Sequence, residues 1–193
     1  MKFKIFIYSI MILAMFSSCT NAQNKKNTSA SNIAEKKVLM AYYSRTNNTE
    51  QVAENIQSFV GGDFFRIETQ KSYPAEYEPA TEVAKKEKDA DERPVLTAQV
   101  DNIEQYDIIF IGFPIWWGDT PMAIATFLES YDLSGKTIIP FCSHGGGGVG
   151  EAFNRVKKLT PNSTNLEGLV VSGSGRKSKV ENWLLKIDII SKL

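Results

Sequence analysis

The sequence predicts an α/β domain, a doubly wound, five-stranded parallel sheet with helices on both faces. From Lys37 onward, short β-type runs alternate with amphipathic helical runs, which is the pattern of parallel strands joined by crossover helices. The chain has 193 residues and is 42% hydrophobic, which is enough for one sizeable core. We therefore expect one folded domain over residues 37–193.

Five runs read as strands because they are short, apolar and rich in β-branched or aromatic residues. They are Val38 to Tyr43, Phe64 to Glu68, Ile108 to Phe113, Thr137 to Cys142 and Leu166 to Ser172. In an open parallel sheet a ligand lies beyond the carboxyl ends of the strands, where the strand order reverses. Function is therefore expected in the loops after the first, third and fourth strands.

Helical periodicity and end signals place three helices between and after these strands. The first is Asn48 to Val60, which has an apolar stripe. The second begins with Thr120 as the N-cap and Pro121 at the first helical position. The third begins with a capping box formed by Ser178 and Glu181.

Two further segments have less regular patterns that also indicate helices. Apolar residues spaced along Val149 to Leu159 favour a fourth helix. Thr81 to Glu92 is charged nearly all round, which is typical of a solvated helix. It lies within a stretch from Thr69 to Val100 that we interpret as a long surface excursion.

Residues 1–19 have the pattern of a signal peptide. Lys2 and Lys4 precede the apolar run Ile5 to Phe16, which is shorter than the roughly 20 residues of a membrane span. Small residues before Cys19 resemble the lipobox of bacterial lipoproteins, in which that cysteine is lipidated. Cleavage after Ala22 is the alternative, and either route predicts export to the cell envelope.

Residues 20–36 are polar and without an apolar period, so we expect a flexible linker. Cys142 is the one cysteine left in the folded part, so no intramolecular disulfide is expected. Basic and acidic side chains balance at 22 each, which gives no global field for binding nucleic acid. Membrane contact is expected through the N-terminal lipid anchor only.

The first of the three loops is rich in hydroxyl groups and leads into a helix. Its residues are Ser44, Arg45, Thr46, Asn47, Asn48 and Thr49. Hydroxyls and backbone N–H groups at a helix N-terminus are donors for phosphate oxygens, and the helix dipole favours negative charge there. Plain helix capping by the same residue types is the alternative interpretation.

The second loop contains two adjacent tryptophans. Its residues are Pro114, Ile115, Trp116, Trp117 and Gly118. Both indoles cannot enter the core from a strand end, so at least one is expected at the surface or over a ligand. A flat ring system is the natural guest, and one tryptophan packed beneath the loop is the alternative role.

The third loop is almost free of side chains. It begins Ser143, His144, Gly145 and Gly146, and three more glycines follow, at positions 147, 148 and 150. Such a loop lets the backbone approach a ligand closely, although a flexible connector has the same composition. His144 is the one histidine of the chain, which excludes a multi-histidine metal site, and no metal site is predicted.

The order of these three loops resembles the flavodoxin family. That family's first loop follows the pattern Ser/Thr-x-Thr-Gly-x-Thr, and this chain matches it at Ser44, Thr46 and Thr49. Asn47 replaces the glycine, and asparagine is the next best residue for a left-handed backbone. The resemblance covers roughly Lys37 to Leu193, and the Pro-Ile-Trp-Trp-Gly stretch looks like a branch distinct from the short electron carriers.

The resemblance implies a flavodoxin-like sheet with strand order 2-1-3-4-5 and the cofactor FMN. By position, Ser44 to Thr49 would hold the FMN phosphate, while Pro114 to Gly118 and Ser143 to Gly146 would flank the isoalloxazine. The chain departs from the family in lacking strong acidity for docking basic partners and the flavin-stacking tyrosine of the third loop.

These observations favour an FMN-binding redox protein, in which the cofactor carries the chemistry and no catalytic side chain is required. Cys142 then reads as a core thiol. Electron transfer to a redox partner protein and reduction of a small acceptor such as a quinone both remain open. Because free nicotinamide cofactors are expected to be scarce outside the cytoplasm, a membrane or protein electron donor is expected. The alternative is a non-redox binding module for a phosphorylated ligand, although a bare phosphate needs no aromatic lid.

Overall fold

The computed structural model describes residues 30–31 and 33–192. The predicted signal peptide, lipidation at Cys19 and cleavage after Ala22 all lie outside these residues, as does most of the predicted linker. In the described part of the chain, no helix has the length and apolar character needed to cross a membrane.

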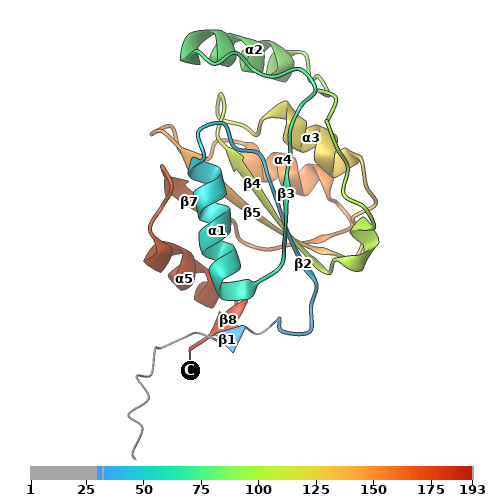
Figure 1. Ribbon diagram of the computed structural model, residues 1–193, viewed down its shortest axis with the longest axis vertical. Coiled ribbons are helices and arrows are strands. Elements are labelled where there is room, and N and C mark those ends of the chain that lie inside the picture. Colours follow the sequence, from blue (N-terminus) through green and yellow to red (C-terminus); the bar gives the residue numbers. More distant parts are fainter. Residues whose placement is uncertain (1–29, 32, 193) are drawn as a thin grey trace, which may run out of the picture.

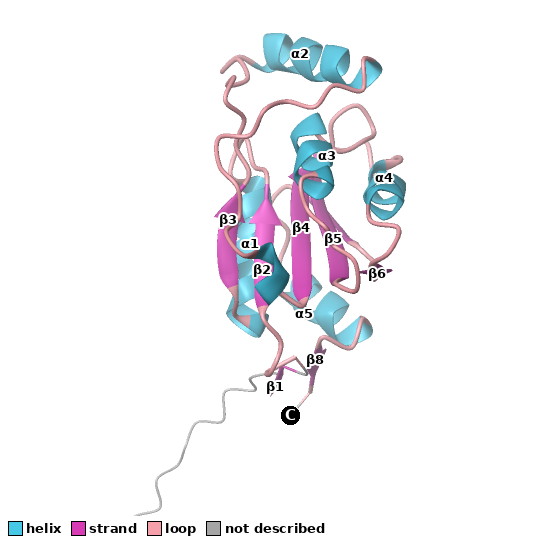
Figure 2. Cartoon of the chain, turned by 90° about the vertical axis from the view of Figure 1, so that its right-hand side faces the viewer, coloured by secondary structure: helices cyan, strands magenta, loops and turns pink. Residues whose placement is uncertain are grey.

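A parallel sheet runs through the centre of the domain (Figures 1 and 2). Its strands are β2 (Val38–Tyr42), β3 (Asp63–Arg66), β4 (Ile108–Pro114), β5 (Thr137–His144), β6 (Thr164–Asn165) and β7 (Leu169–Ser172). The order is β3-β2-β4-β5, with both β6 and β7 paired to β5 at its far edge. Counted along the chain with β6 and β7 as one position, this is the order 2-1-3-4-5, which confirms the predicted fold class.

The last predicted strand, Leu166 to Ser172, is shorter in the structure, and a separate two-residue strand precedes it. β6 ends at Asn165 and β7 begins only at Leu169. Gly168 lies in the break, where a Cβ would fall 2.4 Å from the Phe153 ring. The chain therefore leaves the sheet to pass α4 before it pairs with β5 again.

The described part of the chain contains five α-helices. They are α1 (Asn48–Val60), α2 (Tyr77–Asp89), α3 (Met122–Glu129), α4 (Ala152–Leu159) and α5 (Lys177–Lys186), with a 3-10 turn η1 at Ile103–Gln105. α1 and α5 cover one face of the sheet, and α3 and α4 cover the other (Figures 1 and 2). A separate two-stranded sheet pairs β1 (Ala30–Ser31) with β8 (Ile190–Ser191) at the opposite end of the domain from α2.

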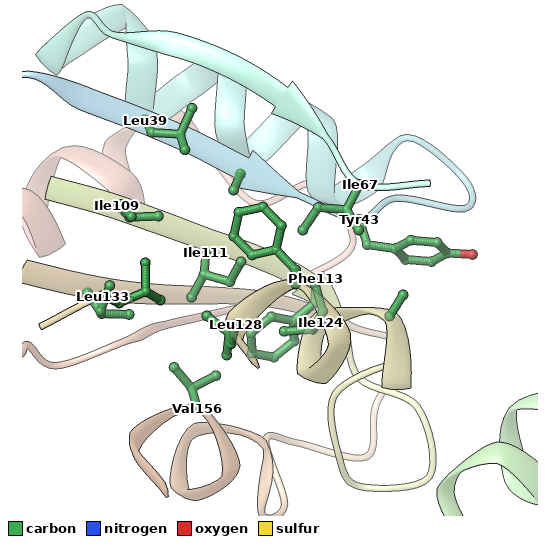
Figure 3. Close-up of a cluster of buried hydrophobic side chains, with 14 of the residues drawn as sticks. Leu39, Tyr43, Ile67, Ile109, Ile111, Phe113, Ile124, Leu128, Leu133 and Val156 are labelled. Carbon is green, nitrogen blue, oxygen red and sulfur yellow. The ribbon is translucent and has the colours of Figure 1, made fainter. Parts of the chain in front are cut away.

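Each face of the sheet has its own hydrophobic core, and β4 contributes side chains to both cores. Ile109, Ile111 and Phe113 point into the core under α3 and α4 (Figure 3), while Ile108 and Phe110 point into the core under α1 and α5. This alternation follows from the two-residue period of a strand. A strand buried on both faces reads as a continuous apolar run, as this one does.

Two predicted helix starts are wrong. α3 begins at Met122 with Pro121 at its N-cap, so Thr120 lies one residue too early to cap it. Among the described residues, the buried Thr120 hydroxyl has no hydrogen-bond partner. α5 begins at Lys177, so Ser178 lies inside the first turn, where it cannot cap. Arg176 occupies the cap position because its carbonyl accepts the first helical hydrogen bonds.

The other two helices also differ from their predicted bounds. Gly150 has a left-handed backbone, with φ 52°, which a right-handed helix cannot include. α4 therefore starts only at Ala152. α2 begins earlier than predicted and ends at Asp89, just before the left-handed Asp91. It is not solvated all round, since one of its faces is buried at Ala80 and Ala84.

Candidate functional site

A cavity of about 710 Å³ lies at the carboxyl edge of the sheet, beneath α2. All three predicted loops line it, through Ser44, Arg45, Thr46, Asn48, Thr49, Pro114, Ile115, Trp116, Trp117, Ser143, His144 and Gly145. Asn47, Gly118 and Gly146 are not among its lining residues. β4 and β5 reach the cavity because they continue past their predicted ends, with Pro114 paired to Ser143.

The first loop turns sharply into α1. Asn47 has φ 60°, the left-handed conformation expected of a residue in place of glycine, and its side chain makes no cap bond. Ser44 Oγ lies 3.4 Å from the Glu50 amide, which is long for a hydrogen bond. Within the described residues, the amides of residues 46–49 find no acceptor. The loop therefore presents free N–H groups at a helix N-terminus, which favours the anion-binding interpretation over plain capping.

A buried hydroxyl pair joins the first loop to the third. The hydroxyls of Thr49 and Ser143 lie 2.9 Å apart, and both residues are buried. Thr46 is exposed, and its hydroxyl accepts a hydrogen bond from the side-chain amide of Asn48 (Nδ2) at 3.3 Å. Thr49 and Ser143 thus fix the base of the cavity, while Thr46 offers its hydroxyl at the mouth.

Arg45 ties the first loop to the excursion between β3 and β4. Its guanidinium donates to the Ala75 carbonyl at 2.5 Å and lies 3.4 Å from the Pro74 carbonyl. The arginine is therefore held by backbone oxygens, and its positive charge stays at the edge of the cavity.

The two tryptophans divide as the sequence predicts, one beneath the loop and one at the surface. Trp116 packs edge-on against Tyr43 and Tyr73, with ring centroids 5.4 and 4.9 Å away. Trp117 is 51% exposed. Its indole N–H donates to the Thr81 carbonyl on α2 at 2.8 Å.

The tryptophan turn, residues 116–119, is strained. Trp117 and Gly118 are both left-handed, with φ 52° and 71°, and the turn is closed by reciprocal backbone bonds between Trp116 and Asp119 of 2.9 and 3.0 Å. A bulky residue in this region costs energy and persists only where its surroundings hold it. Here Arg155 of α4 holds the buried Asp119 with bonds of 2.7 to 2.9 Å.

The roof of the cavity is α2, a helix that was predicted near this position but not as part of the site. Tyr77, Ala80, Thr81 and Ala84 line the cavity from this helix. Their i, i+3, i+4, i+7 spacing marks one helix face. That spacing could have indicated a buried helix face in the sequence. It was hard to recognise because the side chains on this face are small and most of the neighbouring residues are charged. Ser172 and Gly173, at the end of β7, were also missed.

The glycine loop leaves open space beside the tryptophans. A Cβ at Gly145 would meet nothing within 4 Å, and the Gly146 amide donates to His144 Nδ1 at 2.9 Å. Among the described residues, no group of three or more His, Cys, Asp or Glu side chains is placed to hold a metal ion.

Cys142 lies in β5, directly before this loop, and is fully buried. Burial raises the pKa of its thiol to about 12, and the thiolate is the reactive form. In a Cys19→Ala chain, we expect Cys142 to resist iodoacetamide at pH 8 in the folded state and to react once urea is added. Mass spectrometry measures the labelling, and rapid labelling of the folded protein would contradict the burial described here.

The strand order, the loop at the N-terminus of α1 and the cavity at the carboxyl edge of the sheet define a protein of the flavodoxin-like α/β class. The chain belongs to the flavodoxin family, because the family model described as Flavodoxin matches residues 37–187.

Solved structures agree with this assignment. A Bacteroides eggerthii protein designated a flavoprotein is 33% identical, with a TM-score of 0.69 over 79% of this chain and 98% of its own. A similarly designated Bacteroides uniformis protein is 32% identical, with a TM-score of 0.69 over 77% and 97%. A Lactobacillus acidophilus flavoprotein crystallised with FMN shares the fold at 20% identity, with a TM-score of 0.63 over 77% and 98%. A comparison with curated proteins gave no significant match.

Proposed function

We propose that this protein binds FMN in the cavity beneath α2 and acts in redox chemistry. One observation carries the proposal: free amides at the N-terminus of α1 lie in the same cavity as two tryptophans and a glycine loop. FMN, when bound, supplies electron or hydride transfer. The family assignment and the FMN held by the Lactobacillus acidophilus flavoprotein support this choice of cofactor.

The residues at the start of α1 fit a phosphate group. The amides of residues 46–49, the Thr46 hydroxyl and the positive end of the helix dipole all favour an anion at this point. Arg45 adds positive charge at the edge of the cavity. These groups would orient the phosphate end of the cofactor.

The opposite part of the cavity fits a flat ring. Trp116 and Trp117 form one wall, and the open space at Gly145 leaves room where a larger side chain would stand. Aromatic walls favour a planar guest. A binding module for a simple phosphorylated ligand needs no aromatic walls. The tryptophans therefore disfavour that alternative.

The residues of this chain would hold the cofactor, orient it and exclude water from it. In this proposal no side chain acts as nucleophile, which agrees with the buried, unreactive Cys142. The proposal includes two alternatives for the redox chemistry, namely electron transfer to a partner protein and reduction of a small acceptor.

Titration with FMN tests the proposal. We expect the purified protein to bind FMN with quenching of flavin fluorescence, and to bind riboflavin, which lacks the phosphate, much more weakly. Equal affinity for FMN and riboflavin would contradict a phosphate site at the start of α1. Protein that leaves FMN fluorescence unchanged would refute the function.

Thr46→Ala should weaken FMN binding by about 1–3 kcal/mol, the range for a hydrogen bond lost to a charged group. Riboflavin affinity should stay unchanged, because the lost hydroxyl serves the phosphate only. Thr126→Ala, on α3 and outside the cavity lining, is the matched control. If both variants bind FMN as the natural sequence does, Thr46 lies outside the phosphate site.

We also propose that the chain is exported and lipid-anchored through Cys19 to a membrane of the cell envelope, with the folded domain over residues 37–193. The basic start, the short apolar run and the small residues before Cys19 support this. Labelling with radioactive palmitate in a bacterial host should be lost in Cys19→Ser. Equal labelling of Cys19→Ser and the natural sequence would contradict lipidation at Cys19.

A further inference from the structure

We propose that the side of the cavity formed by α2 is a separate subsite for a small, flat, uncharged aromatic molecule, and that Tyr77 sets its affinity. The inference rests on the proposed function, because such a molecule beside FMN would be its electron acceptor. It assigns a role to the wall of the cavity that the three flavodoxin-like loops do not form.

The α2 wall is smooth and apolar. Ala80 and Ala84 are buried along it, and Thr81 turns its carbonyl to the Trp117 indole. Apart from Tyr77, the side chains that line the cavity from this helix are small and leave room beside them. A planar molecule fits such a surface better than a branched or globular one.

Two large aromatic rings at this side of the cavity are exposed, Tyr77 on α2 itself and Trp117 of the second loop, which is bonded to α2 at Thr81. Tyr77 is 74% exposed and Trp117 is 51% exposed, and both line the cavity. Of the four large hydrophobic residues exposed in the described part of the chain, the other two, Phe64 and Val95, lie outside it. Exposed aromatic rings that gather at one cavity mark a binding surface for apolar, ring-shaped ligands.

The cavity offers little for a charged ligand beyond the phosphate loop. Among the described lining residues, the permanently charged side chain is Arg45, and its guanidinium is held by the Pro74 and Ala75 carbonyls. The lysines of α2 nearest Trp117 do not line the cavity and already have partners, Lys85 in Asp89 and Lys88 in the Trp117 carbonyl. A nicotinamide dinucleotide would bring a second set of phosphates to a wall whose cations are engaged elsewhere. An uncharged ligand has no such need.

The position of α2 also favours a small molecule over a protein partner. The helix lies beyond the carboxyl edge of the sheet (Figures 1 and 2), and four of its residues line the cavity from that side. Trp117 holds it there through the bond to Thr81 and through the Lys88 ammonium, which donates to the Trp117 carbonyl at 2.7 Å. A docking protein would meet the outer surface of α2, whereas a small molecule can occupy the space beneath it.

Binding of 2-methyl-1,4-naphthoquinone, measured by calorimetry on the oxidised protein with and without FMN, tests the subsite. We expect Tyr77→Ala to weaken naphthoquinone binding about tenfold and to change FMN affinity less than twofold. Tyr77→Phe should retain binding, because the ring makes the contact. Phe64→Ala removes an exposed ring outside the cavity and is the matched control.

The outcomes separate this inference from the proposed function. If FMN does not bind, the proposed function fails, while naphthoquinone binding that depends on Tyr77 in the FMN-free protein still supports the subsite. Naphthoquinone binding that ignores Tyr77 in both forms, or no binding in either, overturns the subsite. A Tyr77→Ala variant that loses FMN affinity in the same measure also overturns it, since Tyr77 would then belong to the FMN site. Equal binding of naphthalene-2-sulfonate would contradict the preference for an uncharged ligand.

Discussion

Replacing Arg155 with leucine is expected to destabilise the domain by about 3–5 kcal/mol, the range for a buried ion pair that loses one partner. Asp119 is only 3% exposed, and Arg155 holds both of its carboxylate oxygens. Without the guanidinium, an unpaired carboxylate remains under the tryptophan turn. Urea unfolding followed by circular dichroism measures the loss.

The second consequence of this change is local. Arg155 also pairs with Asp91, just beyond the end of α2, at 3.0 Å, so it connects the tryptophan turn to the roof of the cavity. Trp117 fluorescence should therefore become more accessible to acrylamide in the variant. Adding Asp119→Asn should restore part of the stability, because it removes the unpaired charge.

Lys186→Leu is the matched control for the Arg155 prediction. Lys186 pairs with Glu167 at 2.5 Å, but both side chains are mostly exposed, and exposed pairs contribute roughly 0–1 kcal/mol. A variant Arg155→Leu that unfolds at the same urea concentration as Lys186→Leu would refute the structural role given to the buried pair.

Gly150→Ala is expected to cost about 2–5 kcal/mol, because a left-handed backbone and a steric overlap act together. A Cβ at Gly150, where φ is 52°, would lie 2.0 Å from the carbonyl oxygen of Gly118. That oxygen accepts the Glu151 amide at 2.7 Å. The methyl group must therefore push the tryptophan turn away from the start of α4.

Two measurements check the Gly150 prediction. Urea unfolding should show the lost stability, and FMN titration should show weaker binding, because Trp117 moves with its turn. Gly147→Ala is the control for stability, since a Cβ there meets nothing within 4 Å. Stability that falls no further in Gly150→Ala than in Gly147→Ala would show that the turn yields without cost.

Local patterns predicted much of the site. The bounds of α1 agree with the structure at both ends, because its apolar stripe and the glycines after it are local signals. The left-handed turn at Asn47 was also predictable, since few residue types adopt that conformation. The starts of α3 and α5 were not, because Thr120 and Ser178 are good capping residues that the preceding turns place out of position.

By itself, the sequence determined the alternation of strands and helices, the three loops that meet at one edge of the sheet, and the family to which the chain belongs. The alternation and the loops follow from hydrophobic period and turn chemistry, which act between near neighbours, and the family follows from the motif resemblance of those loops. The tertiary structure alone decided that α2 roofs the cavity, that Trp116 packs inward while Trp117 is exposed, and that Arg155 holds the turn. The physical reason is that each depends on contacts between residues far apart in the chain, such as Arg155 with Asp119 and Trp117 with Thr81.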